Sequence, residues 1–335
     1  MRDEEVTMEY RDFGATGLKV SAIGFGCWES GGGYGSFQEE EVKRAVRRAL
    51  DLGINCFDTA RGYGQGQSER ILGEALKGRR DEAIVVTKCG VPPNPERKNR
   101  DSRRGHILES AEQSLKDLGM DHVDVMLVHW PDRAVPWEEP MRALEDLTRA
   151  GKIRFGGVSN FKAEEIEACA QTRRVDVAQY GYHIFDRRME RDVFPVCARH
   201  RIGVMAYGSL AHGLLTGAFT EETKFEEKDW RRGAAERPIF GMRLFAPDNF
   251  RKEVRAVERF KQVAARRGKK VAHLSLAWVL SNPVISTALV GCRTAAEVED
   301  NVNAAGWRAS DGEKEEIDAI CREEGIDPAP DVWLE

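Results

Sequence analysis

The sequence predicts a (β/α)8 barrel, the TIM-barrel fold, and two observations carry this prediction. Eight apolar, strand-like runs alternate with segments of helical periodicity, most of them about 30 residues apart. The runs are apolar throughout, which is typical of parallel strands buried on both faces. Eight such units favour closure into a barrel. An open doubly wound sheet is the alternative.

The predicted elements follow a regular order along the chain. The strand-like runs lie at residues 22–26, 54–57, 83–87, 123–129, 153–158, 175–180, 202–207 and 286–291. Helical spacing is found at 39–53, 68–78, 106–119, 138–151, 249–267 and 271–281, with Ser68 as a candidate cap of the second segment. Ahead of the first run, residues 7–20 predict a short β-hairpin. We expect one domain over residues 1–335, because nothing in the chain reads as a linker.

Long loops are expected at the carboxyl face of the barrel, where the βα connections lie. The longest interval separates the last two runs, and its charged, irregular part at 220–250 predicts a mobile loop over a binding site.

Composition excludes several classes of protein. Of 335 residues, 41% are hydrophobic and 32% charged, with a net charge of −5, so no basic footprint for nucleic acid is present. Seven scattered cysteines without a C-x-x-C pair indicate reduced thiols rather than disulfides or a metal site. The polar, acidic start is unlike a signal peptide, and no apolar run approaches the ~18 residues of a membrane span. We expect a cytoplasmic protein with no metal and with neither nucleic acid nor membrane as a partner.

A glycine-rich loop follows the second run. In RGYGQGQSE (61–69) the glycines do not match G-x-G-x-x-G or the P-loop spacing, and the loop does not follow the first strand as a dinucleotide fingerprint would. GFGCWESGGGYG (24–35) misses both spacings as well. We interpret these glycines as residues that let a loop turn across a barrel mouth.

Polar side chains end several of the apolar runs. Asp58 ends the second run, Lys88 the third and His129 the fourth, while Tyr63 lies in the glycine loop. Each has an ordinary reading as a turn cap, a snorkelling lysine, a structural histidine or a packing aromatic. Together they make chemical sense, because an ammonium lowers the high pKa of a phenol and a carboxylate orients the ammonium. With His129 as a hydrogen-bond donor to a developing oxyanion, the set suits proton delivery to a carbonyl oxygen as hydride reaches its carbon.

At these residues the chain resembles the aldo-keto reductases. FDTARGYGQGQSERILGEAL, VVTK, LVHWP, GKIRFGGVSNF and AQY match that family's motifs in order and spacing over essentially the whole chain. The resemblance implies a (β/α)8 barrel that binds NADP(H) or NAD(H) without a Rossmann domain. It also implies that Asp58, Tyr63, Lys88 and His129 form the catalytic tetrad, with Tyr63 as the general acid.

The resemblance also implies a cofactor site. Ser159, Asn160 and Gln179 match the residues that hold the nicotinamide carboxamide, and Tyr207 matches the aromatic that stacks on the nicotinamide ring. The segment 207–217, with Leu210, Gly213 and Leu215, resembles the loop that clasps the pyrophosphate. The adenosine end resembles 290–301, with Gly291, Arg293, Glu297 and Asn301. Arg293 and a helix starting near Thr294 suit a 2′-phosphate, so NADP(H) is expected over NAD(H), although Glu297 departs from the Arg or Gln common at its position.

The substrate is expected to be a small carbonyl compound or sugar. Trp28 and Trp130 are candidate pocket walls, and Arg61 is a candidate for favouring anionic or hydroxylated substrates. The leading function is reduction of an aldehyde, ketone or sugar. The alternatives are a cofactor-binding regulatory subunit, as in channel-associated relatives, a sugar or polyol dehydrogenase working in the oxidative direction, and, more distantly, a phosphosugar isomerase.

Overall fold

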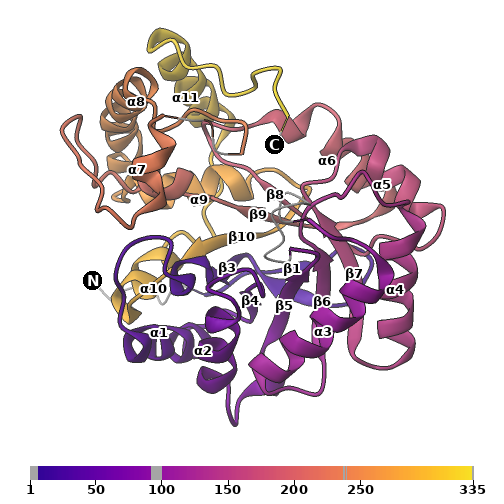
Figure 1. Ribbon diagram of the computed structural model, residues 1–335. Coiled ribbons are helices and arrows are strands. Elements are labelled where there is room, and N and C mark those ends of the chain that lie inside the picture. Colours follow the sequence, from indigo (N-terminus) through magenta and orange to yellow (C-terminus); the bar gives the residue numbers. More distant parts are fainter. Residues whose placement is uncertain (1–6, 92–99, 237, 239, 334–335) are drawn as a thin grey trace.

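The fold is a closed barrel of eight parallel strands surrounded by helices (Figure 1). A computed structural model describes residues 7–91, 100–236, 238 and 240–333. Around the barrel the strands follow the order β10-β3-β4-β5-β6-β7-β8-β9. Their bounds are Ile23–Gly26 (β3), Cys56–Asp58 (β4), Ile84–Cys89 (β5), Val123–Val128 (β6), Ile153–Ser159 (β7), Val177–Gly181 (β8), Gly203–Tyr207 (β9) and Ile285–Gly291 (β10).

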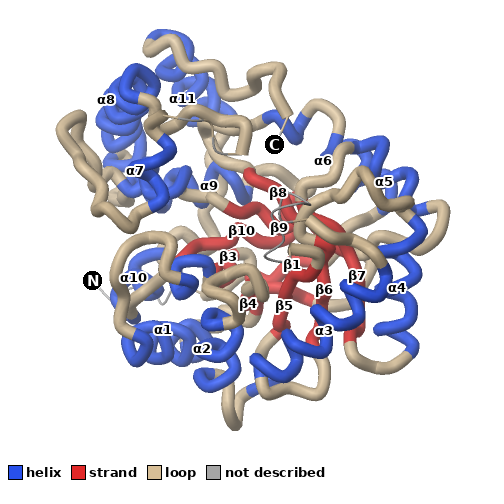
Figure 2. The backbone as a smooth tube through the Cα atoms, viewed as in Figure 1, coloured by secondary structure: helices blue, strands red, loops and turns tan. Residues whose placement is uncertain are grey.

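The predicted barrel is confirmed, and each predicted run contains one of these strands or overlaps it. Strand β10 pairs in parallel with both β3 and β9, which closes the sheet and leaves no open edge. The strands therefore form the centre of the molecule, with helices on the outside (Figure 2). The organisation as one domain over the whole chain stays a prediction.

The predicted hairpin is also present and closes the amino-terminal end of the barrel. It consists of β1 (Tyr10–Asp12) and β2 (Lys19–Ser21), which pair antiparallel. Between them Phe13 is fully buried and packs in one apolar cluster with Val177 and Met205 of the barrel strands. With this end filled, the carboxyl ends of the strands remain available for a site.

Helices cover the barrel, and those predicted at 39–53, 68–78, 106–119, 138–151, 249–267 and 271–281 are among them. The bounds are Glu39–Asp51 (α1), Gln67–Ala75 (α2), Arg104–Leu118 (α3), Glu138–Arg149 (α4), Ala163–Ala170 (α5), Val193–His200 (α6), Trp230–Ala234 (α7), Pro247–Ala265 (α8), Val271–Leu280 (α9), Ala295–Val302 (α10) and Asp311–Glu323 (α11). The predicted cap of α2 is wrong, because the helix begins after Gly66, which has φ 85°. Ser68 lies inside the helix, where its buried hydroxyl donates to the Cys27 carbonyl at 2.8 Å.

The long interval between β9 and β10 folds across the barrel mouth. Its backbone meets the loop after β3, where Trp230 N donates to Gly33 O at 3.1 Å and Tyr34 forms a β-bridge with Asp229. The segment therefore lies against a binding region, as its irregular sequence indicated, and it contains the short helix α7. Residues 237 and 239 of this segment lie outside the described part, as do the first six residues of the chain.

No helix in the described residues is both long enough and apolar enough to cross a bilayer.

Candidate active site

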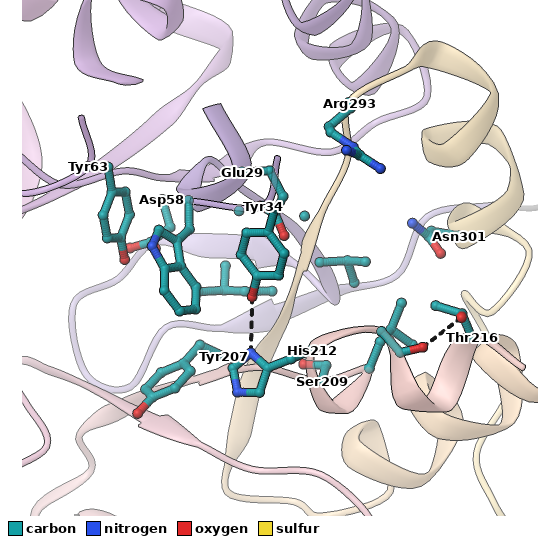
Figure 3. Close-up of a pocket in the computed structure, with 18 of the residues that line it drawn as sticks. Glu29, Tyr34, Asp58, Tyr63, Tyr207, Ser209, His212, Thr216, Arg293 and Asn301 are labelled. Atoms are coloured by element: carbon teal, nitrogen blue, oxygen red, sulfur yellow. Dashed lines mark hydrogen bonds between the residues drawn. The ribbon is translucent and has the colours of Figure 1, made fainter. Parts of the chain in front are cut away.

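A cavity of about 680 Å³ lies at the carboxyl ends of the barrel strands. Residues that follow β3, β4, β5, β6, β7, β9 and β10 line it together with Gln179 of β8, so segments from around the barrel contribute. Tyr63 and Asp58 lie at one end of the view in Figure 3, and Arg293 and Asn301 lie toward the other. The strand ends at which the sequence placed chemistry thus share a single cavity.

The four residues of the predicted tetrad come together at one end. Lys88 Nζ lies 2.8 Å from both carboxylate oxygens of Asp58, 2.9 Å from Thr59 O and 3.1 Å from the Tyr63 hydroxyl. Lys88 and Asp58 are buried. An ammonium with every proton directed to an oxygen is held in one orientation, and it presents one hydrogen bond to the phenol.

Electrostatics at this end differ from the sequence expectation in one respect. Burial lowers the pKa of Lys88 and raises the pKa of Asp58, and each group opposes the shift of the other. Burial, followed by the Asp58 charge, raises the pKa of Tyr63 well above its ordinary value. The expected lowering by Lys88 is absent because Asp58 offsets that charge at 2.8 Å. Tyr63 is therefore a protonated phenol, which is the form a proton donor needs.

His129 faces the same point as Tyr63. Its ring centroid lies 5.9 Å from that of Tyr63 in an edge-to-face arrangement. Burial and the nearby Lys88 charge hold the pKa of His129 well below its usual range, so the ring is neutral. Within the part of the chain that the structure describes, Nδ1 of His129 has no hydrogen-bond partner. A neutral imidazole carries one N–H donor, and His129 lines the cavity, so its ring can donate a hydrogen bond to a ligand there.

The residues expected to hold a carboxamide form a buried network beside the tetrad. Gln179 Nε2 donates to Asp58 Oδ1 at 2.7 Å, and Ser159 Oγ donates to Gln179 O at 3.0 Å. Asn160 Nδ2 donates to Ser159 Oγ at 3.1 Å, and the Tyr207 hydroxyl donates to Asn160 Oδ1 at 2.9 Å. All five line the cavity. The amide groups and the aromatic face therefore fit a planar ring carrying a carboxamide, as the nicotinamide end of a dinucleotide does.

The far end of the cavity contains most of the remaining residues predicted for the cofactor. Those that line it are Leu210, Gly213, Gly291, Arg293, Glu297 and Asn301. Leu215 does not line it, because its side chain is fully buried in the hydrophobic core. The helix start predicted near Thr294 is confirmed, since Thr294 caps α10 and its hydroxyl accepts from Glu297 N.

Several lining residues were not predicted. Tyr34 and His212 join the loop after β3 to the loop after β9 through a hydrogen bond of 3.1 Å between the Tyr34 hydroxyl and His212 Nδ1 (Figure 3). Phe240 packs against both His212 and Tyr207 with ring centroids 5.7 and 5.8 Å away. Tyr34 lies in the glycine-rich cluster 24–35, which is visible in the sequence. Nothing in the local sequence singles out His212 or Phe240 as lining residues.

Glu29 is the most unusual of the residues that the sequence did not single out. Its carboxylate lies over the backbone of Gly291, where a Cβ would come within 2.2 Å of both its oxygens. Burial raises its pKa to about 7, while Arg293 opposes the shift. A carboxyl group that titrates near neutrality thus lies inside the cavity, and only the absence of a side chain at Gly291 gives it room.

Two of the three residues predicted for substrate line the cavity. Trp28 stacks on Trp230 with ring centroids 5.5 Å apart, and Trp130 stacks on Phe240 at 5.9 Å. Arg61 does not line it, because its guanidinium pairs with Asp117 of α3 at 2.9 Å. We therefore no longer expect Arg61 to contact a substrate.

A (β/α)8 barrel with this constellation at its carboxyl end defines the class, an NAD(P)-dependent oxidoreductase. The family model "Aldo/keto reductase family" matches residues 22–322, and the chain belongs to this family.

Individual relatives cover the whole chain. It is 37% identical over 325 residues to the aldo-keto reductase YhdN of Bacillus subtilis, covering 96% of each protein. It is 32% identical over 315 residues to a probable voltage-gated potassium channel subunit beta of Arabidopsis thaliana, covering 89% of this chain and 91% of that protein. The structure of the glycerol dehydrogenase AKR11B4 from Gluconobacter oxydans matches with a TM-score of 0.83 at 32% identity, covering 99% of this chain and 100% of that one. Relatives at 32% identity include one whose name specifies NADP(+) and one whose name specifies NADH.

Proposed function

We propose that this protein reduces the carbonyl group of a small aldehyde, ketone or sugar, with Tyr63 as the proton donor. A bound nicotinamide dinucleotide supplies the hydride. The observation that carries the proposal is the Tyr63 hydroxyl, protonated and 3.1 Å from a lysine ammonium that Asp58 holds in place. As the carbonyl oxygen gains negative charge, Tyr63 transfers its proton and Lys88 stabilises the phenolate that remains.

Each neighbouring residue has a part in this step. His129, neutral and lining the cavity beside Tyr63, donates to the same carbonyl oxygen and fixes its position. Ser159, Asn160 and Gln179 orient the carboxamide, and Tyr207 covers one face of the nicotinamide. Arg293 and Asn301 hold the adenosine end.

The substrate is held by aromatic surfaces. Trp28, Trp130 and Phe240 surround the space beside Tyr63, so the pocket offers flat apolar faces rather than a charged clamp. This composition favours small carbonyl compounds with apolar or sugar-like faces over strongly anionic ones. The similarity to a glycerol dehydrogenase keeps the oxidative direction, from a polyol to a carbonyl, as the second candidate.

The test combines binding and turnover. We expect quenching of tryptophan fluorescence by NADH or NADPH, followed by oxidation of the reduced cofactor with members of a panel of neutral aldehydes and ketones. Failure to bind either dinucleotide would overturn the proposal. Binding without turnover in either direction, on carbonyls or on polyols, would favour the regulatory role that similarity to a channel subunit beta raises.

A further inference from the structure

The beginning of α10, at the end of the cavity far from Tyr63, is occupied by a carboxylate of the chain itself. Glu297 Oε2 accepts from Arg293 N at 2.6 Å and from Thr294 N at 3.2 Å. Backbone N–H groups at a helix start, together with the helix dipole, are the groups that bind a phosphate. Here Glu297 has already taken the two backbone N–H groups that directly precede α10, and it lines the cavity.

The cations at this end are largely neutralised. Lys270 Nζ pairs with Asp300 at 2.7 Å, and Arg231 pairs with both oxygens of Asp229. Among the described residues Arg293 makes no side-chain ion pair or hydrogen bond, which leaves it as the cation here that is open to a ligand.

The field of Arg293 is nevertheless opposed by two carboxylates. Its charge acts on Glu29, and Glu297 holds its backbone N–H. With Lys270 offset by Asp300, the end of the cavity has one cation against two carboxylates when Glu29 is ionised. A site of this kind has no excess positive charge for a dianion.

The continuity of the cavity determines which part of a ligand reaches this end. A dinucleotide whose nicotinamide lies beside Tyr63 and Gln179 must extend its second nucleoside toward Arg293 and Asn301 (Figure 3). NAD(H) presents a ribose 2′-hydroxyl there, whereas NADP(H) presents a 2′-phosphate with a charge between −1 and −2.

We infer that Glu297 makes this protein selective for NAD(H) over NADP(H), because its carboxylate fills the anion site at the start of α10 and accepts a hydrogen bond from a ribose hydroxyl. This inference rests on the proposed function. It reverses the preference for NADP(H) expected from Arg293 and the helix start near Thr294, because the departure noted at Glu297 outweighs them. A 2′-phosphate would either displace Glu297 from two N–H donors, which loses hydrogen bonds, or lie beside its carboxylate, which repels it. A ribose hydroxyl is uncharged and can donate to the carboxylate, so it meets neither penalty.

Glu297 and Thr294 form a capping box at the start of α10, and a second capping box, at the start of α11, offers a matched control. In α11 Glu313 Oε2 accepts from Ser310 N at 2.7 Å, in the same motif but away from the cavity. Glu313→Gln thus removes a helix-capping carboxylate without touching the binding region. It separates the general effect of weakening a cap from a specific effect on the cofactor.

The experiment measures the dissociation constants of NADH and NADPH for the full chain by isothermal titration calorimetry. We expect NADPH to bind about tenfold or more weakly than NADH, with the ratio falling as salt screens the repulsion. Glu297→Gln should bring the ratio down about tenfold, mainly by tightening NADPH, whereas Glu313→Gln should leave it unchanged.

Two results would overturn the inference. One is tighter binding of NADPH than of NADH by the unmodified chain, and the other is a Glu297→Gln variant that changes both constants equally. If that variant does not fold, the ratio and its salt dependence in the unmodified chain decide the matter. Absence of binding by both dinucleotides would instead remove the proposed function itself and the inference with it.

Discussion

The ion pair at the catalytic end of the cavity is buried, whereas the pair between Lys270 and Asp300 at the far end is open to solvent. The side chains of Lys88 and Asp58 are 0% and 5% exposed and meet at 2.8 Å, while Lys270, paired with Asp300 at a similar distance, is 68% exposed. A buried pair cannot lose one partner without leaving an uncompensated charge, but an exposed pair exchanges its partner for water at little cost. The charged groups beside Tyr63 are therefore fixed in place, whereas those at the far end can change partners.

The sharpest test of the catalytic end is Tyr63→Phe. Removing the hydroxyl removes the proposed proton donor, so kcat should fall by about a hundred- to ten-thousand-fold while the dissociation constant of the cofactor stays unchanged. Steady-state kinetics and cofactor titration measure the two quantities. Tyr34→Phe is the matched control, since it removes a phenol from the same cavity and should lower kcat much less. A Tyr63→Phe variant with full kcat would show that the proton comes from elsewhere.

The contrast in burial should also appear in stability. Lys88→Met leaves Asp58 buried without its cation, so the free energy of unfolding should fall by about 3–5 kcal/mol. Lys270→Met breaks the exposed pair with Asp300, which spans 2.7 Å, and should cost at most about 1 kcal/mol. Denaturant unfolding monitored by circular dichroism measures both. Equal losses in the two variants would contradict the distinction between a fixed and an adjustable end.

Two glycines sharpen the comparison at the level of the backbone. A Cβ on Gly157 would lie 1.9 Å from the Val177 carbonyl of the neighbouring strand, and a Cβ on Gly291 would lie 1.8 Å from Glu29 Oε1. The strand carbonyl cannot move without disturbing the barrel, but the Glu29 side chain can rotate. Gly157→Ala should therefore destabilise by about 3 kcal/mol or more, and Gly291→Ala by about 1 kcal/mol.

The control for this pair is Glu29→Ala combined with Gly291→Ala. Removing the carboxylate that the new methyl group would meet should recover most of the loss measured for Gly291→Ala in the same unfolding experiment. No recovery would place the strain in the backbone instead.

The smallest expected effect concerns pH. Burial raises the pKa of Glu29 to about 7, above the ordinary value near 4.3 that holds in the unfolded chain. Between these values the folded chain keeps a proton that the unfolded chain has released, so this contribution to stability is lost as pH rises through about 4 to 7. The melting temperature of the unmodified chain should therefore fall relative to Glu29→Gln across this window. The melting temperature of Glu299→Gln, which keeps Glu29, should fall in parallel with that of the unmodified chain.

Much of the fold was readable in the sequence because its signals are local. The apolar runs predicted the strands, and terminal polar residues such as Asp58 and Lys88 predicted which edge holds the site. Ser68 was misread as a cap because its hydroxyl finds the Cys27 carbonyl across 41 positions of sequence, a contact that no local pattern encodes. The helices α6 and α11 gave no signal that we recognised.

The residues of the candidate site also divide into those with a local signal in the sequence and those that depend on distant contacts. The positions of the tetrad and of the carboxamide residues follow from strand ends, so their motifs predicted them. Arg61 was placed wrongly because its partner at 2.9 Å, Asp117, lies on α3, far from Arg61 in the sequence. Phe240 reaches the cavity only because the long loop folds across the barrel mouth, whereas His212 lies inside the predicted segment 207–217 but was not singled out there.

The sequence by itself determined the barrel, the end of the barrel that holds the chemistry and the residues able to perform it, because hydrophobic periodicity and strand termini are properties of adjacent residues. Only the tertiary structure decided the charge states and the pairing. Burial and distances between groups far apart in the chain set the pKa values of Tyr63 and Glu29. The folded structure also places the Glu297 carboxylate next to Arg293. Electrostatic energies act through space, and the order of residues does not specify them.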